Sequence, residues 1–198
     1  GLTCDFVIEN APQGAPAVQA RAESISGKHD GVIFGVDALM EYRAERDDSY
    51  AAIEGSKLEK LAPGAYCVRY KAKENHDASP DTTVTIAAGR KLVVALPSQQ
   101  EGYTLTATAS ELDWRGSATL KLDIDQAYFA GKDFAVKVNG EKVAFAANGT
   151  YELKDVESDI NVTVEGLLKH ETDGTGWKSD DGSHWHICRC GDVIDKAA

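Results

Sequence analysis

The stretch Thr119-Leu-Lys-Leu-Asp-Ile-Asp125 places an apolar side chain at every second position and a polar one between. Residues two apart point to the same face of a β-strand, so this pattern predicts a strand with one buried and one solvated face. The stretch Tyr103-Thr-Leu-Thr-Ala-Thr-Ala109 alternates in the same way, with Thr at the polar positions. Both stretches favour half-buried strands over helices.

Similar short runs follow one another along most of the chain, separated by turn residues. Asn139-Gly140 and Asn148-Gly149 indicate tight turns, because Asn and Gly tolerate the positive φ that such turns need. The segment 36–46 fits either a helix with Asp37 as its N-cap or a strand hairpin that includes Met40-Glu-Tyr-Arg43, and we favour the hairpin. The predicted fold class is therefore all-β, with short strands of the kind found in β-sandwiches.

A length of 198 residues fits one large or two small domains. The polar string Pro97-Ser-Gln-Gln-Glu-Gly102 separates two regions of alternating sequence and is typical of a linker. We therefore expect two small β-sandwich domains in tandem plus a short C-terminal tail. The predicted first module spans residues 1–96, the hinge 97–102, the second module 103–168, and a polar tail 169–198.

The charge balance restricts the classes of partner. The chain carries 32 acidic and 21 basic side chains, which gives a formal net charge of −11. Such a chain repels the phosphate backbone, so nucleic acid is excluded as an expected partner. No apolar run approaches the roughly 18 residues of a membrane-spanning helix, so we expect no membrane insertion of this segment.

One turn sequence has its own physical logic. In Leu61-Ala-Pro-Gly-Ala-Tyr66, Pro63 fixes φ and Gly64 lets the chain reverse. Tyr66 then enters the next strand with its hydroxyl able to bond the backbone just upstream, a device that fixes the corners of β-sandwiches. We favour this structural role for Tyr66 over contact with a ligand.

These motifs carry a resemblance to a known class of proteins. Ser24-Ile-Ser-Gly-Lys-His-Asp-Gly31, Leu61-Ala-Pro-Gly-Ala-Tyr-Cys-Val-Arg-Tyr70 and Ala78-Ser-Pro-Asp-Thr-Thr-Val-Thr-Ile86 resemble a repeat module of large surface proteins from Gram-positive gut bacteria. The segment Leu61–Tyr66 is also similar to the Pro-Gly-x-Tyr corner of fibronectin type III and Ig-like domains. Asp159–Gly166 resembles the last strand of bacterial Ig-like modules. The resemblance implies two Ig-like or fibronectin-III-like sandwiches.

The tail His184-Trp-His-Ile-Cys-Arg-Cys-Gly-Asp192 is similar to a His-Trp-His-x-Cys-x-x-Cys-Gly-Asp segment that follows such modules. The resemblance as a whole implies an extracellular modular protein of the cell wall or cell surface, often a carrier of glycan-active or adhesive domains. It supplies no catalytic residues.

The expected function is that of a non-catalytic extracellular module pair, which spaces, presents or adheres, and not that of an enzyme. Its expected partners are host or cell-wall glycans or surface proteins. The alternative is a carbohydrate-binding module accessory to a glycan-active enzyme, which would need exposed aromatic platforms. The aromatic candidates are Tyr42, Tyr50, Tyr70, Trp114 and Tyr128. The carboxylates of Asp123 and Asp125 fit a solvated strand face better than a calcium or acid/base pair.

Four cysteines leave two questions open. Cys4 and Cys67 lie in or beside apolar strand sequence and could form a disulfide if their strands are adjacent, although we favour buried free thiols.

His184, His186, Cys188 and Cys190 combine imidazole and thiol groups, which suit zinc. Zinc knuckles normally use Cys-x-x-Cys, whereas this spacing is Cys-x-Cys, and in an extended strand the four side chains would spread over about 20 Å. We therefore favour no cofactor here, with Trp185 and Ile187 packed on the second module, and zinc binding as the alternative.

Overall fold

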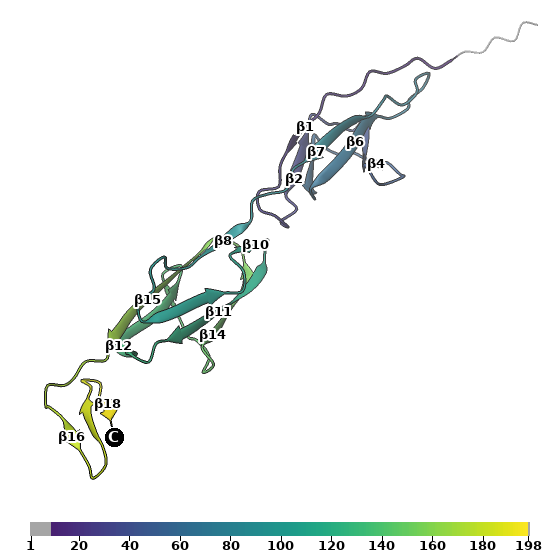
Figure 1. Ribbon diagram of the computed structural model, residues 1–198. Helices are drawn as coiled ribbons and strands as arrows, with labels where there is room; N and C mark the ends of the chain where they lie inside the picture. Colours follow the sequence, from purple (N-terminus) through teal and green to yellow (C-terminus); the bar gives the residue numbers. More distant parts are fainter. Residues whose placement is uncertain (1–8, 198) are drawn as a thin grey trace, which may run out of the picture. The chain divides into compact units, whose positions relative to one another are not determined.

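The computed structural model describes residues 9–197, and every regular element in that range is a β-strand (Figure 1). The all-β prediction is confirmed. The chain divides into two compact units that meet between Lys91 and Leu92. Cys4, and with it the predicted pairing of Cys4 with Cys67, lies outside the described residues. No helix in the described part of the chain is long and apolar enough to cross a membrane.

The first unit is a sandwich of two sheets. One sheet has the order β1-β2-β5, with β1 (Gln19–Arg21), β2 (Gly31–Phe34) and β5 (Lys57–Leu61). The other has the order β4-β3-β6-β7, with β4 (Ala51–Ala52), β3 (Met40–Ala44), β6 (Gly64–Tyr70) and β7 (Thr82–Ile86). One apolar core joins them, since buried Ile33 of β2 belongs to the same cluster as Val68 of β6 and Ile86 of β7.

Two local predictions in this unit are confirmed. Strand β3 pairs antiparallel with β4, as Glu41 opposite Ala52, so the segment that could have been helical forms a hairpin. The Tyr66 hydroxyl donates a hydrogen bond of 2.9 Å to the carbonyl oxygen of Ala62, as expected for a sandwich corner. Gly64 has φ of 150°, which L-residues rarely adopt.

The second unit also packs two sheets against each other. The larger sheet has the order β10-β8-β15-β12-β13, with β10 (Glu111–Leu112), β8 (Leu92–Ala95), β15 (Ile160–Lys169), β12 (Tyr128–Val138) and β13 (Glu141–Val143). The smaller has the order β14-β11-β9, with β14 (Thr150–Val156), β11 (Gly116–Ile124) and β9 (Tyr103–Ala107). Buried Leu92 and Val162 of the first sheet and Leu105 and Leu120 of the second form its interior.

The boundary between the units differs from the expected one. We predicted that the first module ends at residue 96, but β8 pairs with β15 and β10 of the second unit. Leu92 is fully buried while Val93 is 44% exposed, so the alternation of β8 fits the second unit's core. A strand with alternating apolar residues at a domain boundary can pack into the core of either unit. Sequence composition alone therefore assigned β8 to the wrong unit.

The predicted hinge at 97–102 is likewise an ordered loop of the second unit. The side-chain amide of Gln100 donates to the carbonyl oxygen of Leu105 at 3.1 Å, and its oxygen accepts from the Leu105 N–H. Gly102 is buried against the ring of Tyr128, with φ of 77°, so a Cβ there would collide with that ring. Gln100 therefore satisfies backbone groups locally, and the string is part of the second unit and not a linker.

The turn predictions in this unit hold. Asn139 and Gly140 both have positive φ, 49° and 86°, and join β12 to β13 with Val138 opposite Glu141. Gly149 has φ of 77° and donates its N–H to the Ala146 carbonyl, in a turn that leads from β13 to β14 of the other sheet.

Candidate functional site

The C-terminal segment, expected as a polar tail, forms a three-stranded antiparallel sheet. Its strands are β16 (Lys178–Ser179), β17 (His184–Ile187) and β18 (Val193–Ala197). Asp180 organises the first turn, because one carboxylate oxygen accepts the N–H groups of Gly182 at 3.0 Å and Ser183 at 2.8 Å. The hydrogen bond from Gly182 lowers the pKa of Asp180. An Asp side chain that accepts hydrogen bonds from backbone N–H groups two and three residues later is typical of a turn. The alternation pattern alone did not indicate this turn.

The second turn of this sheet brings two cysteines together. Cys188 follows β17, and its N–H donates to the Asp192 carbonyl at 2.7 Å, while the Gly191 N–H donates to the Cys188 carbonyl at 2.8 Å. Gly191 has φ of 97°, in the left-handed region that glycine tolerates. The resulting tight turn lets the Cys190 backbone N–H lie 3.3 Å from the Cys188 sulfur and donate to it.

His170 completes a cluster with these two thiols. Its ring nitrogen Nδ1 lies 3.2 Å from Cys188 Sγ and 3.2 Å from Cys190 Sγ. One ligand atom from each of the three residues lies within 4.8 Å of the others. We call these three residues the His-Cys-Cys cluster.

Pairing of the chain after β15 with the end of β17 sets this geometry. Thr172 forms an antiparallel bridge with Cys188. The Arg189 N–H donates to the Glu171 carbonyl at 3.0 Å, next to the bridge. His170 itself is held by the second unit's sandwich: its N–H donates to the Ala127 carbonyl at 2.8 Å, and its ring lies 5.0 Å from the Phe129 ring.

The two thiols have divergent acidities. Burial opposes ionisation of Cys188, but hydrogen bonds from the Cys190 thiol, the Cys190 N–H and His170 outweigh it and lower the pKa of Cys188 to about 7. Desolvation and the interaction with Cys188 raise the pKa of Cys190 to about 11. The Cys190 thiol also donates to Asp192 Oδ2 at 3.4 Å. Cys188 therefore ionises more readily than Cys190.

The other two predicted zinc ligands have a different setting. His184 and His186 lie on β17, and both rings contact Trp177, with centroid distances of 4.7 Å and 3.8 Å. Among the described residues, the structure thus groups Cys188 and Cys190 with His170 and not with the two histidines of β17. Sequence reasoning missed His170 because it lies 18 residues before Cys188 and only strand pairing brings them together.

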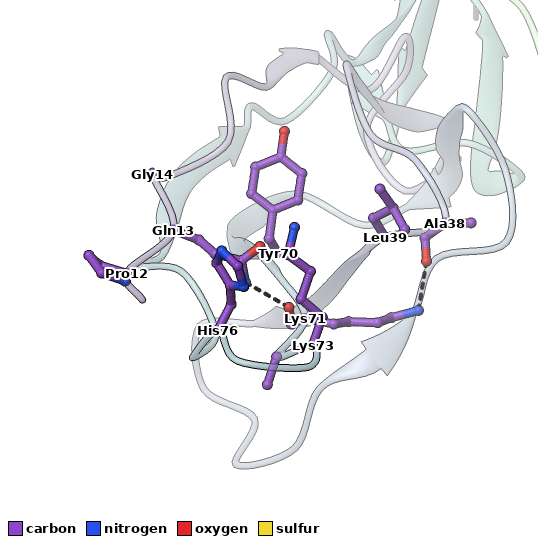
Figure 2. Close-up of a pocket in the computed structure, with 10 residues that line it drawn as sticks. Pro12, Gln13, Gly14, Ala38, Leu39, Tyr70, Lys71, Lys73 and His76 are labelled. Carbon is purple, nitrogen blue, oxygen red and sulfur yellow. Dashed lines mark hydrogen bonds between the residues drawn. The ribbon is translucent and has the colours of Figure 1, made fainter. Parts of the chain in front are cut away.

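A pocket of about 470 Å³ lies on the first unit. Figure 2 shows Tyr70 and Leu39 among its lining residues, with Leu39 68% exposed. The side-chain amide of Gln13 donates to the Lys71 carbonyl at 2.9 Å, and Lys71 Nζ donates to the Ala38 carbonyl at 2.9 Å (Figure 2). The pocket therefore combines an apolar surface with fixed polar groups.

The aromatic candidates for a glycan platform are all half-buried. Tyr70 lines the pocket of Figure 2. Tyr50 already contacts other side chains of the protein. The Arg69 guanidinium lies 3.7 Å from its ring centroid, and its hydroxyl donates to Asp81 at 2.6 Å. The Tyr128 ring packs over Gly102.

The carboxylates of β11 and the turn after it are exposed, as expected for a solvated strand face. Asp123 pairs with Lys121 at 3.1 Å on the exposed side of β11. Asp125 lies just beyond the strand, where its N–H donates to the Gly102 carbonyl at 3.0 Å.

Comparisons of this chain with protein families, with curated proteins and with solved structures found no match.

Proposed function

We propose that this chain is a non-catalytic pair of extracellular β modules within a larger bacterial surface protein, where it spaces or presents other domains. The observation that carries the proposal is the division into two consecutive units, each with an apolar core built from its own stretch of chain. The resemblance of both halves to Ig-like and fibronectin-III-like repeats supports it. Domains that each have their own hydrophobic core can fold independently, so they can be joined in series without affecting the fold of their neighbours.

Calorimetry of the intact chain tests the independence that a spacer requires. Ile33 and Leu120 are both fully buried, one in each unit. Removing either side chain by Ile33→Ala or Leu120→Ala should cost about 2–5 kcal/mol, because each leaves a cavity. We expect two unfolding transitions, with each variant lowering the temperature of one and leaving the other in place. A single transition lowered by both variants would contradict the proposal.

Protease accessibility on intact cells tests the location. Cells that display the full-length protein should lose this segment to added protease before they lyse. A segment that is protected until lysis would contradict an extracellular role, whatever the calorimetry shows.

The pocket of the first unit favours a second candidate function, carbohydrate binding. Tyr70 offers a partly exposed ring beside the backbone and side-chain polar groups of Gln13 and Lys71, a combination suited to sugars. A glycan array on the intact chain tests this candidate, with Tyr70→Ala as the probe and Trp114→Ala, in the second unit, as the matched control. Binding that only Tyr70→Ala removes would support it, and equal binding by both variants would exclude this pocket.

A further inference from the structure

The C-terminal sheet has almost no apolar interior. Among the described side chains of residues 171–197, Cys188 is the only one that is buried, at 1% exposure. Trp177 and Val193, which could have formed a core, are 56% and 52% exposed. A small sheet of this kind needs another source of stability, and small domains commonly obtain it from a disulfide or a structural metal.

The spacing of the His-Cys-Cys cluster fits a tetrahedral zinc ion. Zinc lies about 2.3 Å from thiolate sulfur and about 2.0–2.1 Å from imidazole nitrogen, so tetrahedral geometry sets N···S edges of about 3.6 Å and an S···S edge of about 3.8 Å. The observed distances from His170 Nδ1 to the two sulfurs are both 3.2 Å, and all three ligand atoms lie within 4.8 Å of one another. The two N···S distances would have to lengthen by about 0.4 Å to match the edges of that tetrahedron.

We propose that His170 Nδ1, Cys188 Sγ and Cys190 Sγ bind a structural zinc ion, which fastens the C-terminal sheet to the end of β15. Two thiolates neutralise the charge of Zn²⁺, and the thiol protons leave to solvent when the metal binds. Sulfur ligands select zinc over calcium and magnesium, which prefer oxygen. Asp192 is not a member of this group of ligand atoms, although its Oδ2 lies 3.4 Å from Cys190 Sγ.

The surroundings of the cluster orient its ligands. The Cys190 backbone N–H donates to Cys188 Sγ, and hydrogen bonds of this kind stabilise a thiolate. The His170 ring is positioned by its contact with Phe129 and by the backbone bond to Ala127. Metal sites depend on such outer contacts to fix the direction of each ligand.

The tight turn also answers the objection raised by the Cys-x-Cys spacing. An extended chain would separate the sulfurs, but the left-handed Gly191 and the Gly191-to-Cys188 hydrogen bond fold residues 188–191 back on themselves. Both thiols then approach one imidazole from the same turn. The third ligand comes from outside the predicted set and replaces His184 and His186.

Cobalt(II) titration of the intact, reduced and metal-free chain tests the proposal, because cobalt substitutes for zinc and gives thiolate charge-transfer and tetrahedral d–d absorption bands. We expect one cobalt per chain, displaced by zinc. His170→Ala, Cys188→Ser and Cys190→Ser should each weaken binding by more than about 100-fold, beyond the 10- to 100-fold typical of outer-shell changes.

Matched controls separate this site from its alternatives. His184→Ala and His186→Ala should leave cobalt affinity and spectrum unchanged, as should Cys67→Ser in the first unit. Near-ultraviolet circular dichroism would confirm that each variant keeps its sandwiches. A measurement without variants is protection of Cys188 and Cys190 from alkylation by added zinc, read by mass spectrometry.

Three results would overturn the proposal. The first is tight cobalt binding by His170→Ala, especially if His184→Ala or His186→Ala loses it. The second is a reduced wild-type chain that binds no cobalt and gains no alkylation protection from zinc. The third is protein purified without chelator that carries no metal and has a Cys188–Cys190 disulfide, seen as a mass lower by two hydrogens.

Discussion

The second unit contains two β regions that are held together in different ways. Its sandwich buries aliphatic side chains from both sheets, including Leu92, Leu105, Leu120 and Val162, each at most 2% exposed. The C-terminal sheet has hydrogen-bonded turns at residues 180–183 and 188–192, but the single buried one of its described side chains is a cysteine. The hydrogen-bonding pattern of a sheet therefore does not reveal what stabilises it.

The difference has a physical origin. Burial of apolar surface contributes roughly 25 cal/mol per Å², whereas hydrogen bonds exchanged with water contribute little net free energy each. A region in which Cys188 is the only buried one of the described side chains would depend on cross-links, and the zinc ion proposed for the His-Cys-Cys cluster would supply one. Experiments that remove apolar groups and experiments that remove the cluster should therefore affect different parts of the unit.

The largest effect is expected from Leu105→Ala in the sandwich. Leu105 is 2% exposed, and its truncation should lower the free energy of unfolding by about 2–5 kcal/mol through lost burial and a residual cavity. Val193→Ala is the matched change in the C-terminal sheet, where the side chain is 52% exposed, and its effect should stay below about 0.5 kcal/mol. Urea unfolding of both variants measures the two losses in free energy of unfolding. Equal losses would contradict the difference between the two regions.

An intermediate effect is expected from removing metal with a chelator. If zinc fastens the C-terminal sheet, chelation should abolish the hydrogen-exchange protection of amides in β17 and β18 and leave that of β11 and β14 unchanged. We expect this outcome because a region that is stabilised locally can open without global unfolding of the protein. Equal protection in both regions before and after chelation would show that the C-terminal sheet is held by something else.

Much of the sandwich architecture could be predicted from alternation and turn residues, because period-two patterns and Asn-Gly pairs act locally. The Tyr66 corner and the β3–β4 hairpin were of this kind. The assignment of β8 failed because Leu92 and Val94 fit either neighbouring core equally well. Strand pairing, not alternation, decides which core such a strand joins.

The candidate site was predictable only in part. Cys188 and Cys190 stand out in the sequence because thiols two residues apart can share an ion once a turn intervenes. His170 does not stand out, because the bridge between Thr172 and Cys188 is a long-range pairing with no local signature. The predicted grouping of His184 and His186 with the two cysteines failed for a related reason. Alternation places both on the same face as the cysteines, but Trp177, which directly precedes β16, contacts their rings.

The smallest effect concerns a polar contact inside the apolar-stabilised first unit. Asp30 accepts hydrogen bonds from the Ser24 hydroxyl at 2.6 Å and the Ser24 N–H at 2.7 Å, and Lys28 lies 3.5 Å away. The bonds from Ser24, followed by the charge of Lys28, lower the pKa of Asp30 below 3.8. The ionised form therefore stabilises the fold at pH values above 3.8, and this contribution is lost as the pH falls through the lowered pKa.

Asp30→Asn should remove that contribution while keeping a side chain of similar size. The difference in stability between wild type and variant should be small and constant near neutral pH, and it should shrink toward zero in acid. Because the carboxylate is partly exposed, screening by salt should reduce it further. Urea unfolding of the wild type and the variant in parallel, from neutral pH down into acid, measures this difference in stability. A difference as large as the loss expected for Leu105→Ala, or one that widens in acid, would mean that polar contacts, and not the apolar core, stabilise the first unit.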